Sequence, residues 1–302
     1  MYVEQRNIGA FARSVYSQYG EDGILEEVFR RLGVAAGYFV EFGAWDGVHL
    51  SNAYNLACKG WSGLFIEGNA ERFAALQRNL AGKNVKLVNR YVALEGADSL
   101  DAILEEFASP GDIDLLSIDI DSDDLAVFMS LRQAKPKCVV IEFNPTIPFD
   151  TEYVNKRGRQ IGNSALSIKR YGDSIGYALI ARTQTNLILL MNDLRERAGI
   201  SEIALERTPE DVFCRYAFGY DGTFLRLCRG FENEAPDVMT VPWHRYRMHQ
   251  PIPRLMRGWD HGQAMPVLEL VVSLGALAVM HPRAFFRETK NLWHRAPKRA
   301  RR

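Results

Sequence analysis

Two glycines follow the first predicted strand at a spacing suited to holding a nucleoside. In the stretch FVEFGAWDG the strand ends at Glu41 and continues into Gly43 and Gly47. Glycines in such a turn let the backbone approach a ligand closely. The spacing E-x-G-x-x-x-G differs from the dinucleotide pattern G-x-G-x-x-G, because Ala44 and Trp45 replace its second glycine. An ordinary strand-to-helix turn explains the two glycines equally well, so the motif needs support from elsewhere.

A second acidic residue lies where doubly wound folds bind a ribose. Glu67 ends the second predicted strand, 24 residues after Gly43. Alternatively, Glu67 is an exposed carboxylate at the start of the helix that follows and binds no ligand. Acidic residues such as Glu41 and Asp46 beside the turn suit a cationic sulfonium better than a pyrophosphate. The two acidic strand ends and the glycine turn therefore favour S-adenosylmethionine over NAD.

Carboxylates are concentrated after the fourth predicted strand. The sequence LLSIDIDSDD places four aspartates at the edge where α/β sheets bind ligands. Asp123 and Asp124 suit the first turn of a helix. Asp119 and Asp121 are the better candidates for chemistry, either as a base for an acceptor hydroxyl or as ligands of a hard cation.

Further candidate side chains follow the fifth strand and the glycine turn. Glu142 and Asn144 should reach the same edge as Asp119 and Asp121, and the four together predict a site for a magnesium-like ion, as in the catechol O-methyltransferase group. His49 could act as a base or contact the cofactor. A structural role for the histidine is the alternative.

The pattern of apolar residues predicts the elements that hold these side chains. The predicted strands are Tyr38–Phe42, Gly63–Ile66, Val85–Val88, Leu115–Ile118 and Cys138–Phe143, and the helices between them are Ala70–Leu80, Asp98–Phe107 and Asp124–Gln133. A helix at Ala165–Ile175 and a hairpin of Tyr177–Arg182 with Asn186–Met191 follow. This order predicts an α/β, Rossmann-like seven-stranded methyltransferase sheet, mostly parallel with an antiparallel last strand.

Four regions are expected along the chain. Residues 1–35 should form a loop and helix that cover the cofactor site, and residues 36–195 the methyltransferase core. Residues 196–263 should form an irregular accessory region that binds the acceptor, and residues 264–302 an apolar helix with a basic tail. Aromatic residues between Phe213 and Trp259 could stack on sugars, although packing explains them equally well.

Composition and charge limit the partners. The formal net charge is zero, but residues 281–302 hold eight Lys/Arg and one Glu, so the rest of the chain is mildly acidic. This distribution disfavours nucleic acid as a partner. The apolar stretch 265–280 is shorter than the ~20 residues that span a bilayer. Residues 265–302 suit either peripheral contact with anionic lipid or a homodimer helix with a basic tail.

The spacing of the cysteines and the N-terminal residues indicate the cellular compartment in which we expect the protein. The four cysteines form no CxxC pair, which suits reduced thiols and disfavours a zinc site. The first residues lack the apolar segment of a secretory signal. We therefore expect a cytoplasmic protein, at the inner face of the membrane if the tail binds lipid.

Five segments in order resemble the FkbM-type methyltransferase family, and most closely its members associated with bacterial surface-polysaccharide gene clusters. They are Tyr16–Leu25, Phe39–Leu56, Gly60–Phe73, Asp112–Asp124 and Val139–Pro148, and the resemblance covers about residues 14–191. The family's fourth-strand segment commonly reads like IDIDGND, whereas this chain has Ser122 and Asp123 in place of the glycine and asparagine. The geometry of that turn is therefore open.

The resemblance implies an S-adenosylmethionine-dependent enzyme that methylates a sugar hydroxyl. Catalytic roles are expected for Asp119, Asp121 and His49. The residues expected to line the cofactor are Gln18, Glu41, Gly43, Ala44, Asp46, Gly47, Ser51, Asn52, Glu67, Gly68 and Asp119. The expected acceptor is a bacterial surface glycan or its lipid-linked precursor. The alternatives are a non-catalytic nucleotide-fold partner in a membrane-associated glycan assembly complex and an NAD-dependent sugar enzyme.

Overall fold

The computed structural model describes most of the first two thirds of the chain. The described residues are 7–107, 109–145, 147, 149, 152–157 and 160–206, the strands at 214–218, 223–228 and 238–240, and residues 278, 279, 282 and 286. Contacts within the chain divide it between Pro209 and Glu210 into two units.

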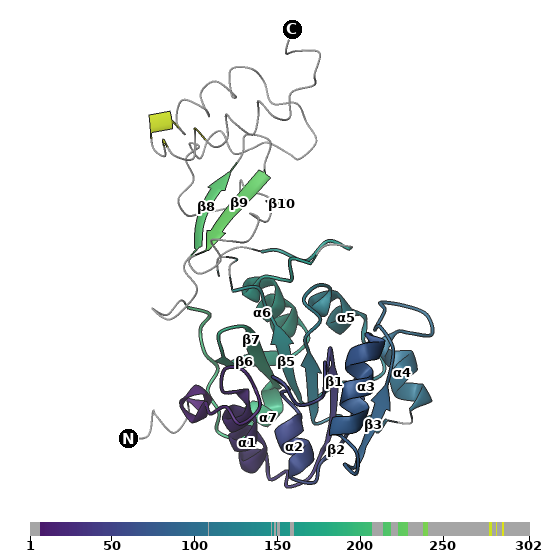
Figure 1. The fold of residues 1–302 in the computed structure, drawn as a ribbon. Coiled ribbons are helices and arrows are strands. Elements are labelled where there is room, and N and C mark those ends of the chain that lie inside the picture. The colour runs from purple at the N-terminus through teal and green to yellow at the C-terminus, as the bar shows by residue number, and fades with distance from the viewer. Residues whose placement is uncertain are drawn as a thin grey trace. The chain divides into compact units, whose positions relative to one another are not determined.

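The first unit is built on a seven-stranded sheet (Figure 1). Its strands are β1 (Tyr38–Phe42), β2 (Ser62–Ile66), β3 (Val85–Val88), β4 (Leu115–Ile118), β5 (Cys138–Glu142), β6 (Tyr177–Arg182) and β7 (Asn186–Met191). Their order is β3-β2-β1-β4-β5-β7-β6, with β1 to β5 parallel and β7 antiparallel to both of its neighbours. The predicted Rossmann-like methyltransferase sheet with an antiparallel last strand is confirmed.

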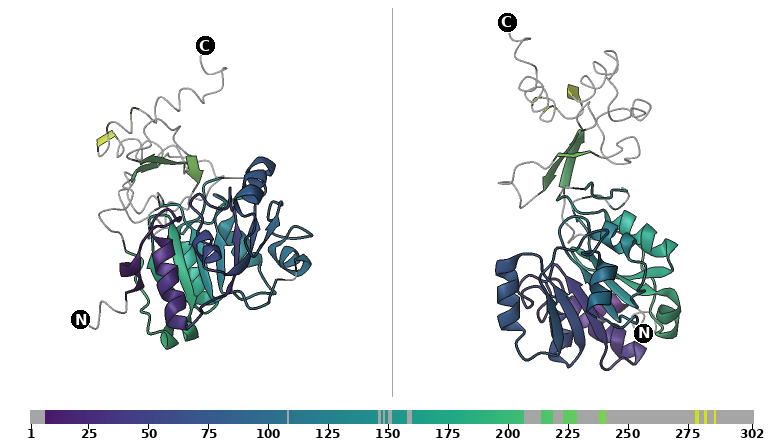
Figure 2. Two further views of the ribbon diagram at one scale, coloured as in Figure 1. Left: turned by 60° about the horizontal axis from the view of Figure 1, so that its bottom comes forward. Right: turned by 90° about the vertical axis from the view of Figure 1, so that its right-hand side faces the viewer.

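Helices cover both faces of this sheet (Figure 2). One face packs against α4 (Leu100–Glu106), α5 (Asp124–Ser130) and α6 (Ala165–Ser174). The other packs against α1 (Glu21–Leu32), α2 (Tyr54–Cys58), α3 (Ala70–Asn79) and α7 (Asn192–Arg197). A short 3₁₀ helix, η2 (Ile8–Phe11), precedes α1. Because both faces are covered, the central strands are apolar throughout, which is why their bounds could be predicted from the sequence.

The predicted and observed elements differ mainly at their ends. The side chain of Asn69 caps α3 by accepting from the backbone N–H groups of Glu71 and Arg72. The helix α5 is shorter than predicted because Leu131 takes an extended conformation and packs into the core. The short helices α2 and α7 were not predicted, because one or two turns are too few to show a helical period.

The described part of the second unit is an antiparallel sheet of β8 (Cys214–Phe218), β9 (Thr223–Cys228) and β10 (Val238–Thr240). These strands lie in the segment that was expected to be irregular, so that expectation was wrong for them. The strands are short, and the mixed composition around them hides their period. Residues 264–302 lie outside the described residues except at four positions.

The residues just beyond β7 belong to the first unit. The backbone of Ile203 donates to the carbonyl of Leu179 in β6, and Ile200 is buried against the sheet. The first unit therefore extends past residue 195, where the expected core ended. Among the described residues, no helix is both long and apolar enough to cross a membrane.

The turns that follow β1 and β4 are in direct contact. Gly43 has a φ of +75°, and a Cβ built there would lie 1.6 Å from the backbone oxygen of Asp119. Any side chain at position 43 would therefore push the two turns apart. Gly33, at the end of α1, has a φ of +72° and nothing within 4 Å of such a Cβ.

We predict that Gly43→Ala destabilises the protein much more than Gly33→Ala does. The control carries only the left-handed backbone cost of about 1 kcal/mol. The variant at Gly43 adds the steric clash, and we expect a total loss of about 3 kcal/mol or more. Urea unfolding measures both losses. Equal losses for the two variants would show that the close approach does not matter.

Candidate active site

A row of polar side chains lies at the carboxyl edge of the sheet, on the face covered by α1, α2 and α3. On this face every second residue of each strand is apolar. A polar residue takes this position at the carboxyl end of the strand: Glu41 at the end of β1, Glu67 after β2, Ser117 near the end of β4 and Glu142 at the end of β5. The register places Glu41 beside Ser117, and Glu142 beside Asn186 at the start of β7. Five neighbouring strands thus contribute polar groups to one edge, and the sequence predicted polar residues at the ends of four of them, all except β7.

Glu41 holds the chain that follows the glycine turn. Its carboxylate accepts the Ser51 hydroxyl at 2.5 Å and the backbone N–H of Asn52 at 2.8 Å. The amide of Asn52 donates in turn to the Ser117 hydroxyl at 3.1 Å. Burial raises the pKa of Glu41 to about 7, although these hydrogen bonds lower it. The Oδ1 atom of Asn52 is buried without a hydrogen-bond partner, so it is available to accept from a ligand.

Glu67 holds the glycine turn from the neighbouring strand. Its two carboxylate oxygens accept the backbone N–H groups of Trp45 at 2.8 Å and Asn69 at 2.7 Å. Each oxygen has a further lone pair, so a ribose hydroxyl could still bind. Gly68 lies against the ring of the exposed Tyr91, because a Cβ at Gly68 would be 2.2 Å from that ring.

The predicted loop residues after Gly43 have mainly structural contacts. Asp46 accepts the backbone N–H groups of Val48 at 2.9 Å and His49 at 2.7 Å, and so shapes the turn. Ala44 and Gly47 are buried, and Gly47 packs against Leu76 of α3 and against Leu80, which directly follows that helix.

The outer surface of this loop carries Trp45 and His49. The Trp45 side chain is 48% exposed, and the Arg72 guanidinium lies 3.7 Å from its ring centre. The exposed His49 ring packs edge-on against Trp45. No described contact joins His49 to the aspartates after β4, so its catalytic role stays a prediction.

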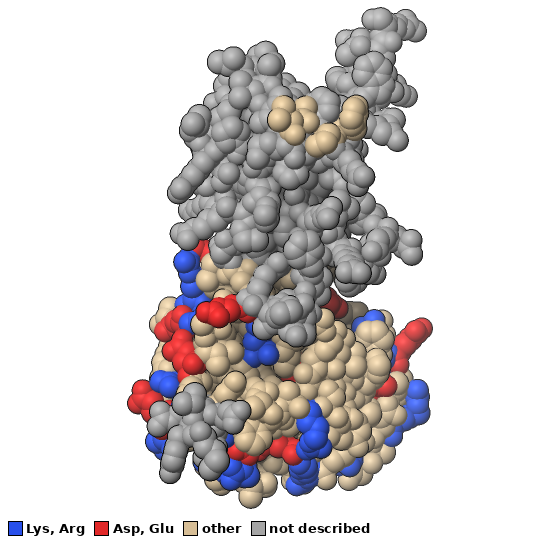
Figure 3. Space-filling view, turned by 90° about the vertical axis from the view of Figure 1, so that its left-hand side faces the viewer, with Lys and Arg blue, Asp and Glu red and all other residues tan. Residues whose placement is uncertain are grey.

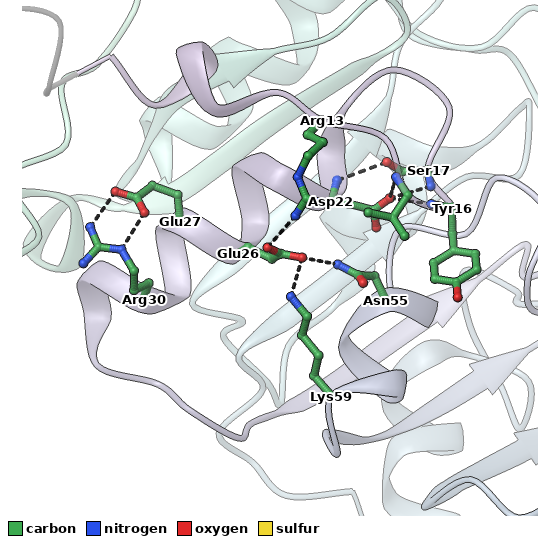
Figure 4. A network of polar contacts seen from close by, with 10 residues as sticks. Arg13, Tyr16, Ser17, Asp22, Glu26, Glu27, Arg30, Asn55 and Lys59 are labelled. Carbon is green, nitrogen blue, oxygen red and sulfur yellow. Dashed lines mark hydrogen bonds and ion pairs between the residues drawn. The ribbon is translucent and has the colours of Figure 1, made fainter.

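Two buried carboxylates at the start of α1, Glu21 and Asp22, hold the N-terminal loop. Figure 4 shows the contacts of Asp22. One oxygen of Asp22 accepts the backbone N–H groups of Val15, Tyr16 and Ser17 at 2.7–2.8 Å. A backbone bridge between Ser17 and Leu50 places this loop beside the chain that follows the glycine turn. This part of the loop therefore lies next to the chain that follows the glycine turn, and the expected role of residues 1–35 in covering the cofactor site stays a prediction.

Glu21 connects the same loop to the turn between β6 and β7. It accepts the Thr183 hydroxyl at 2.6 Å and the Asn186 amide at 2.9 Å, and its other oxygen accepts the backbone N–H of Tyr19. Gln18 is exposed, and its amide donates to the Tyr19 hydroxyl. Its predicted contact with the cofactor stays a prediction.

Three carboxylates meet beyond β4 and β5. Asp119, Asp121 and Glu142 each place an oxygen within 4.8 Å of the others, so the group could hold a metal ion. Burial and the neighbouring negative charges raise the pKa of Asp119 and of Glu142 well above the usual range. A cation among them would relieve the repulsion. The predicted convergence of these three residues is therefore observed.

The turn that carries these aspartates contains no glycine and is held by side-chain contacts. Asp121 takes a left-handed conformation with φ 58°, which aspartate tolerates better than most residues. The carboxylate of Asp124 accepts the backbone N–H groups of Ile120 and Ser122. Asp124 therefore stabilises the turn, and its burial raises its pKa to about 6.

Asn144 and Asp123 connect the site to the segment that follows β5. The amide of Asn144 donates to the carbonyl of Ile161 at 2.6 Å, and Asp123 accepts the amide of Asn155 at 2.7 Å. Asp123 directly precedes α5 at the N-cap position, but its side chain forms no capping hydrogen bond. The role of Asn144 as a metal ligand stays a prediction.

The carboxylates of this edge have no basic partner among the described residues. Those without an ion pair to lysine or arginine are Glu21, Asp22, Glu41, Glu67, Asp119, Asp121, Asp124 and Glu142. Elsewhere on α1, Glu26 and Glu27 are paired with arginines and a lysine. On the face of the molecule drawn in Figure 3, acidic and basic side chains are also mixed, unlike the carboxylates of this edge. The site therefore favours a positively charged ligand.

Backbone strain is concentrated in the same turns. Among the described residues, the non-glycine residues with positive φ are Trp45, Leu50 and Asp121, and all three follow β1 or β4. Such strain gathers at functional sites. Sequence reasoning did not single out Ser117, Asn186 or the contacts of Glu21. A polar residue at an inward position of an otherwise apolar strand is the signal that could have found the first two.

We predict that Glu41 makes stability depend on pH. Its pKa is about 7 in the folded protein and 4.5 when unperturbed, so the folded state keeps a proton that the unfolded state loses. This contribution is fully present below about pH 4.5 and is lost as the pH rises through 7, a change of roughly 3 kcal/mol.

Urea unfolding between pH 5 and pH 8 tests this. Glu41→Gln should lose less stability than the wild type over that range, because glutamine mimics the protonated acid. The exposed Glu71 on α3 provides the control Glu71→Gln. Parallel pH profiles for the wild type and the variant at Glu41 would contradict the prediction.

Comparison with protein-family models and with curated proteins finds no match for this chain. Among solved structures, it is similar to a proposed O-methyltransferase from Klebsiella pneumoniae, with 15% identity and a TM-score of 0.38 over 63% of this chain and 88% of the other. It is also similar to a TehB-like SAM-dependent methyltransferase from Corynebacterium glutamicum, with 13% identity and a TM-score of 0.35 over 63% of this chain and 95% of the other. The assignment of the fold rests on the strand order and register.

Proposed function

We propose that the chain is an S-adenosylmethionine-dependent methyltransferase that methylates a hydroxyl of a sugar in a bacterial surface glycan or its lipid-linked precursor. The observation that carries this proposal is the row of carboxylates without basic partners at the carboxyl edge of a sheet with methyltransferase strand order. A ligand with a sulfonium and an ammonium group offsets that charge, whereas the pyrophosphate of NAD adds to it. The sugar acceptor is supported by the resemblance of the five sequence segments.

The residues at the edge fit the parts of such a cofactor. Glu67 ends β2, where doubly wound folds bind the ribose. The turn at Gly43 lets the backbone come close, and the buried, unpartnered Oδ1 of Asn52 suits an ammonium donor. The N-terminal loop at Ser17 lies beside this region and would help to exclude water.

The chemistry needs alignment and a proton acceptor. S-adenosylmethionine, when bound, supplies a methyl group on a positively charged sulfur. The chain would orient the acceptor hydroxyl toward that methyl group. A carboxylate oxygen of Asp119 or Asp121 would accept the hydroxyl proton, and a pKa raised to about 8 makes the ionised form of Asp119 a stronger base for this task.

A divalent cation fits the same group of carboxylates. Asp119, Asp121 and Glu142 offer oxygen ligands of the kind that magnesium prefers. Such an ion would supply a positive charge that orients the acceptor hydroxyl. The three side chains would then be held ionised.

We predict micromolar binding of S-adenosylmethionine and no binding of NAD, measured by calorimetry on the full chain. Glu67→Gln should weaken binding by about tenfold, because a hydrogen bond to a charged group is lost. Glu71→Gln should leave binding unchanged. Circular dichroism confirms that both variants are folded. Binding of NAD alone would favour a dinucleotide enzyme, and binding of neither ligand a non-catalytic partner.

We also predict that magnesium stabilises the protein through Asp121. Millimolar magnesium chloride should raise the melting temperature of the wild type, since a ligand at ten times its Kd adds about 1.4 kcal/mol. Asp121→Asn should abolish this rise. Asp112→Asn should keep it, because Asp112 is 73% exposed and lies at the opposite edge of the sheet. An equal rise in all three proteins would rule out this metal site.

A further inference from the structure

We propose that the acceptor carries an anionic group, a carboxylate or a phosphate, which Lys156 and Arg157 bind. This inference rests on the proposed function and names the class of its substrate. The two basic residues lie in the segment that follows β5, between Glu142 and α6.

Hydrogen bonds attach this segment to the turn that carries the aspartates. The amide of Asn155 donates to Asp123 at 2.7 Å, and the amide of Asn163 donates to the carbonyl of Ser122 at 3.1 Å. The backbone N–H of Asn155 also donates to the side chain of Asn163 at 2.9 Å. Lys156 therefore follows directly on a residue that is bonded to the turn of Asp119 and Asp121.

The segment is extended and has a buried and an exposed side. Tyr153 and Asn155 are 5% and 7% exposed, and the backbone of Tyr153 donates to the hydroxyls of Ser164 and Ser167 in the α6 region. The intervening Val154 is 45% exposed. This alternation is that of an extended strand. The hydrogen bonds of Tyr153 and Asn155 fix the backbone of this segment, so Val154 and Lys156 lie on its exposed side.

The charges on the outer side are not neutralised within the described chain. Glu152 is paired with Arg170 on α6. Lys156 and Arg157 are exposed and have no ion pair or hydrogen bond among the described residues. Two cations without a partner among the described residues therefore follow Asn155 in the chain, and Asn155 is bonded to a turn whose carboxylates also lack basic partners.

This arrangement separates two tasks for the acceptor. Its hydroxyl must reach Asp119 and Asp121, and its anionic group would be attracted to Lys156 and Arg157 rather than to the aspartates. Arginine binds a carboxylate or phosphate through two parallel hydrogen bonds, and lysine adds a point charge. A neutral sugar would gain nothing from these residues. The anion could be the carboxylate of a uronic acid or the phosphate of a sugar phosphate.

The test compares saccharides of different charge on the full-length protein. The probes are cellotriose, trigalacturonate and glucose 1-phosphate, and calorimetry measures their binding in the presence of S-adenosylhomocysteine. Methyl transfer from labelled S-adenosylmethionine is followed with the same probes. The test variant is Lys156→Gln/Arg157→Gln. The control is Arg132→Gln/Lys135→Gln, two exposed basic residues before β5 at the opposite edge of the sheet.

The wild type should bind at least one anionic probe about tenfold or more tightly than cellotriose, with a preference that falls as salt is added. The test variant should lose this preference for the anionic probe, and the control should keep it. Where methyl transfer is seen, the loss should appear as a higher KM for the anionic probe with an unchanged kcat. Preference for trigalacturonate identifies a uronic acid, and preference for glucose 1-phosphate a sugar phosphate.

Equal binding of neutral and anionic probes, binding of none of them, or an unchanged preference in the test variant overturns the inference. Binding of S-adenosylmethionine is measured separately in the same samples. If S-adenosylmethionine does not bind, the proposed function is overturned. If it binds but one of the three results above is found, only the inference of an anionic acceptor is overturned.

Discussion

The contact between Gly43 and the backbone oxygen of Asp119 determines how the site is assembled. It allows no side chain at position 43, so the turns after β1 and β4 lie directly against each other. The glycine turn and the aspartate turn are therefore one surface, although they are more than seventy residues apart in the chain. Glu67 supports this surface from β2 by accepting the backbone N–H of Trp45.

The electrostatics of the edge follow from its position in the sheet. Parallel strands end together, so the carboxylates that end β1, β2 and β5 come close to one another whether or not a ligand is present. Burial then disfavours their charged forms, which is why the pKa values of Glu41, Asp119 and Glu142 are raised. Some of the acids, such as Asp22 and Asp124, are stabilised by backbone N–H groups. Asp119 and Glu142 face other carboxylates, so a proton or a cation is needed to offset the repulsion between them.

The fold was largely predictable from the sequence, and the site only in outline. Continuous apolar runs identified β1 to β7 because strands buried on both faces carry a strong signal. The row formed by Glu41, Glu67 and Glu142 was predicted because each follows such a run. The hydrogen bonds that define their roles were not, since Glu41 is bonded to Ser51 and Glu67 to Trp45 through turns whose geometry the sequence does not specify.

The contacts of Glu21 have a consequence for the order in which the protein folds. Its carboxylate is bonded to Thr183 and Asn186, 162 and 165 residues further along the chain. Contacts at such separations close late, because a long loop must first be ordered. During synthesis the N-terminal loop must wait for the β6–β7 hairpin to leave the ribosome. The edge that would bind the cofactor is thus completed by almost the last part of the first unit to be made.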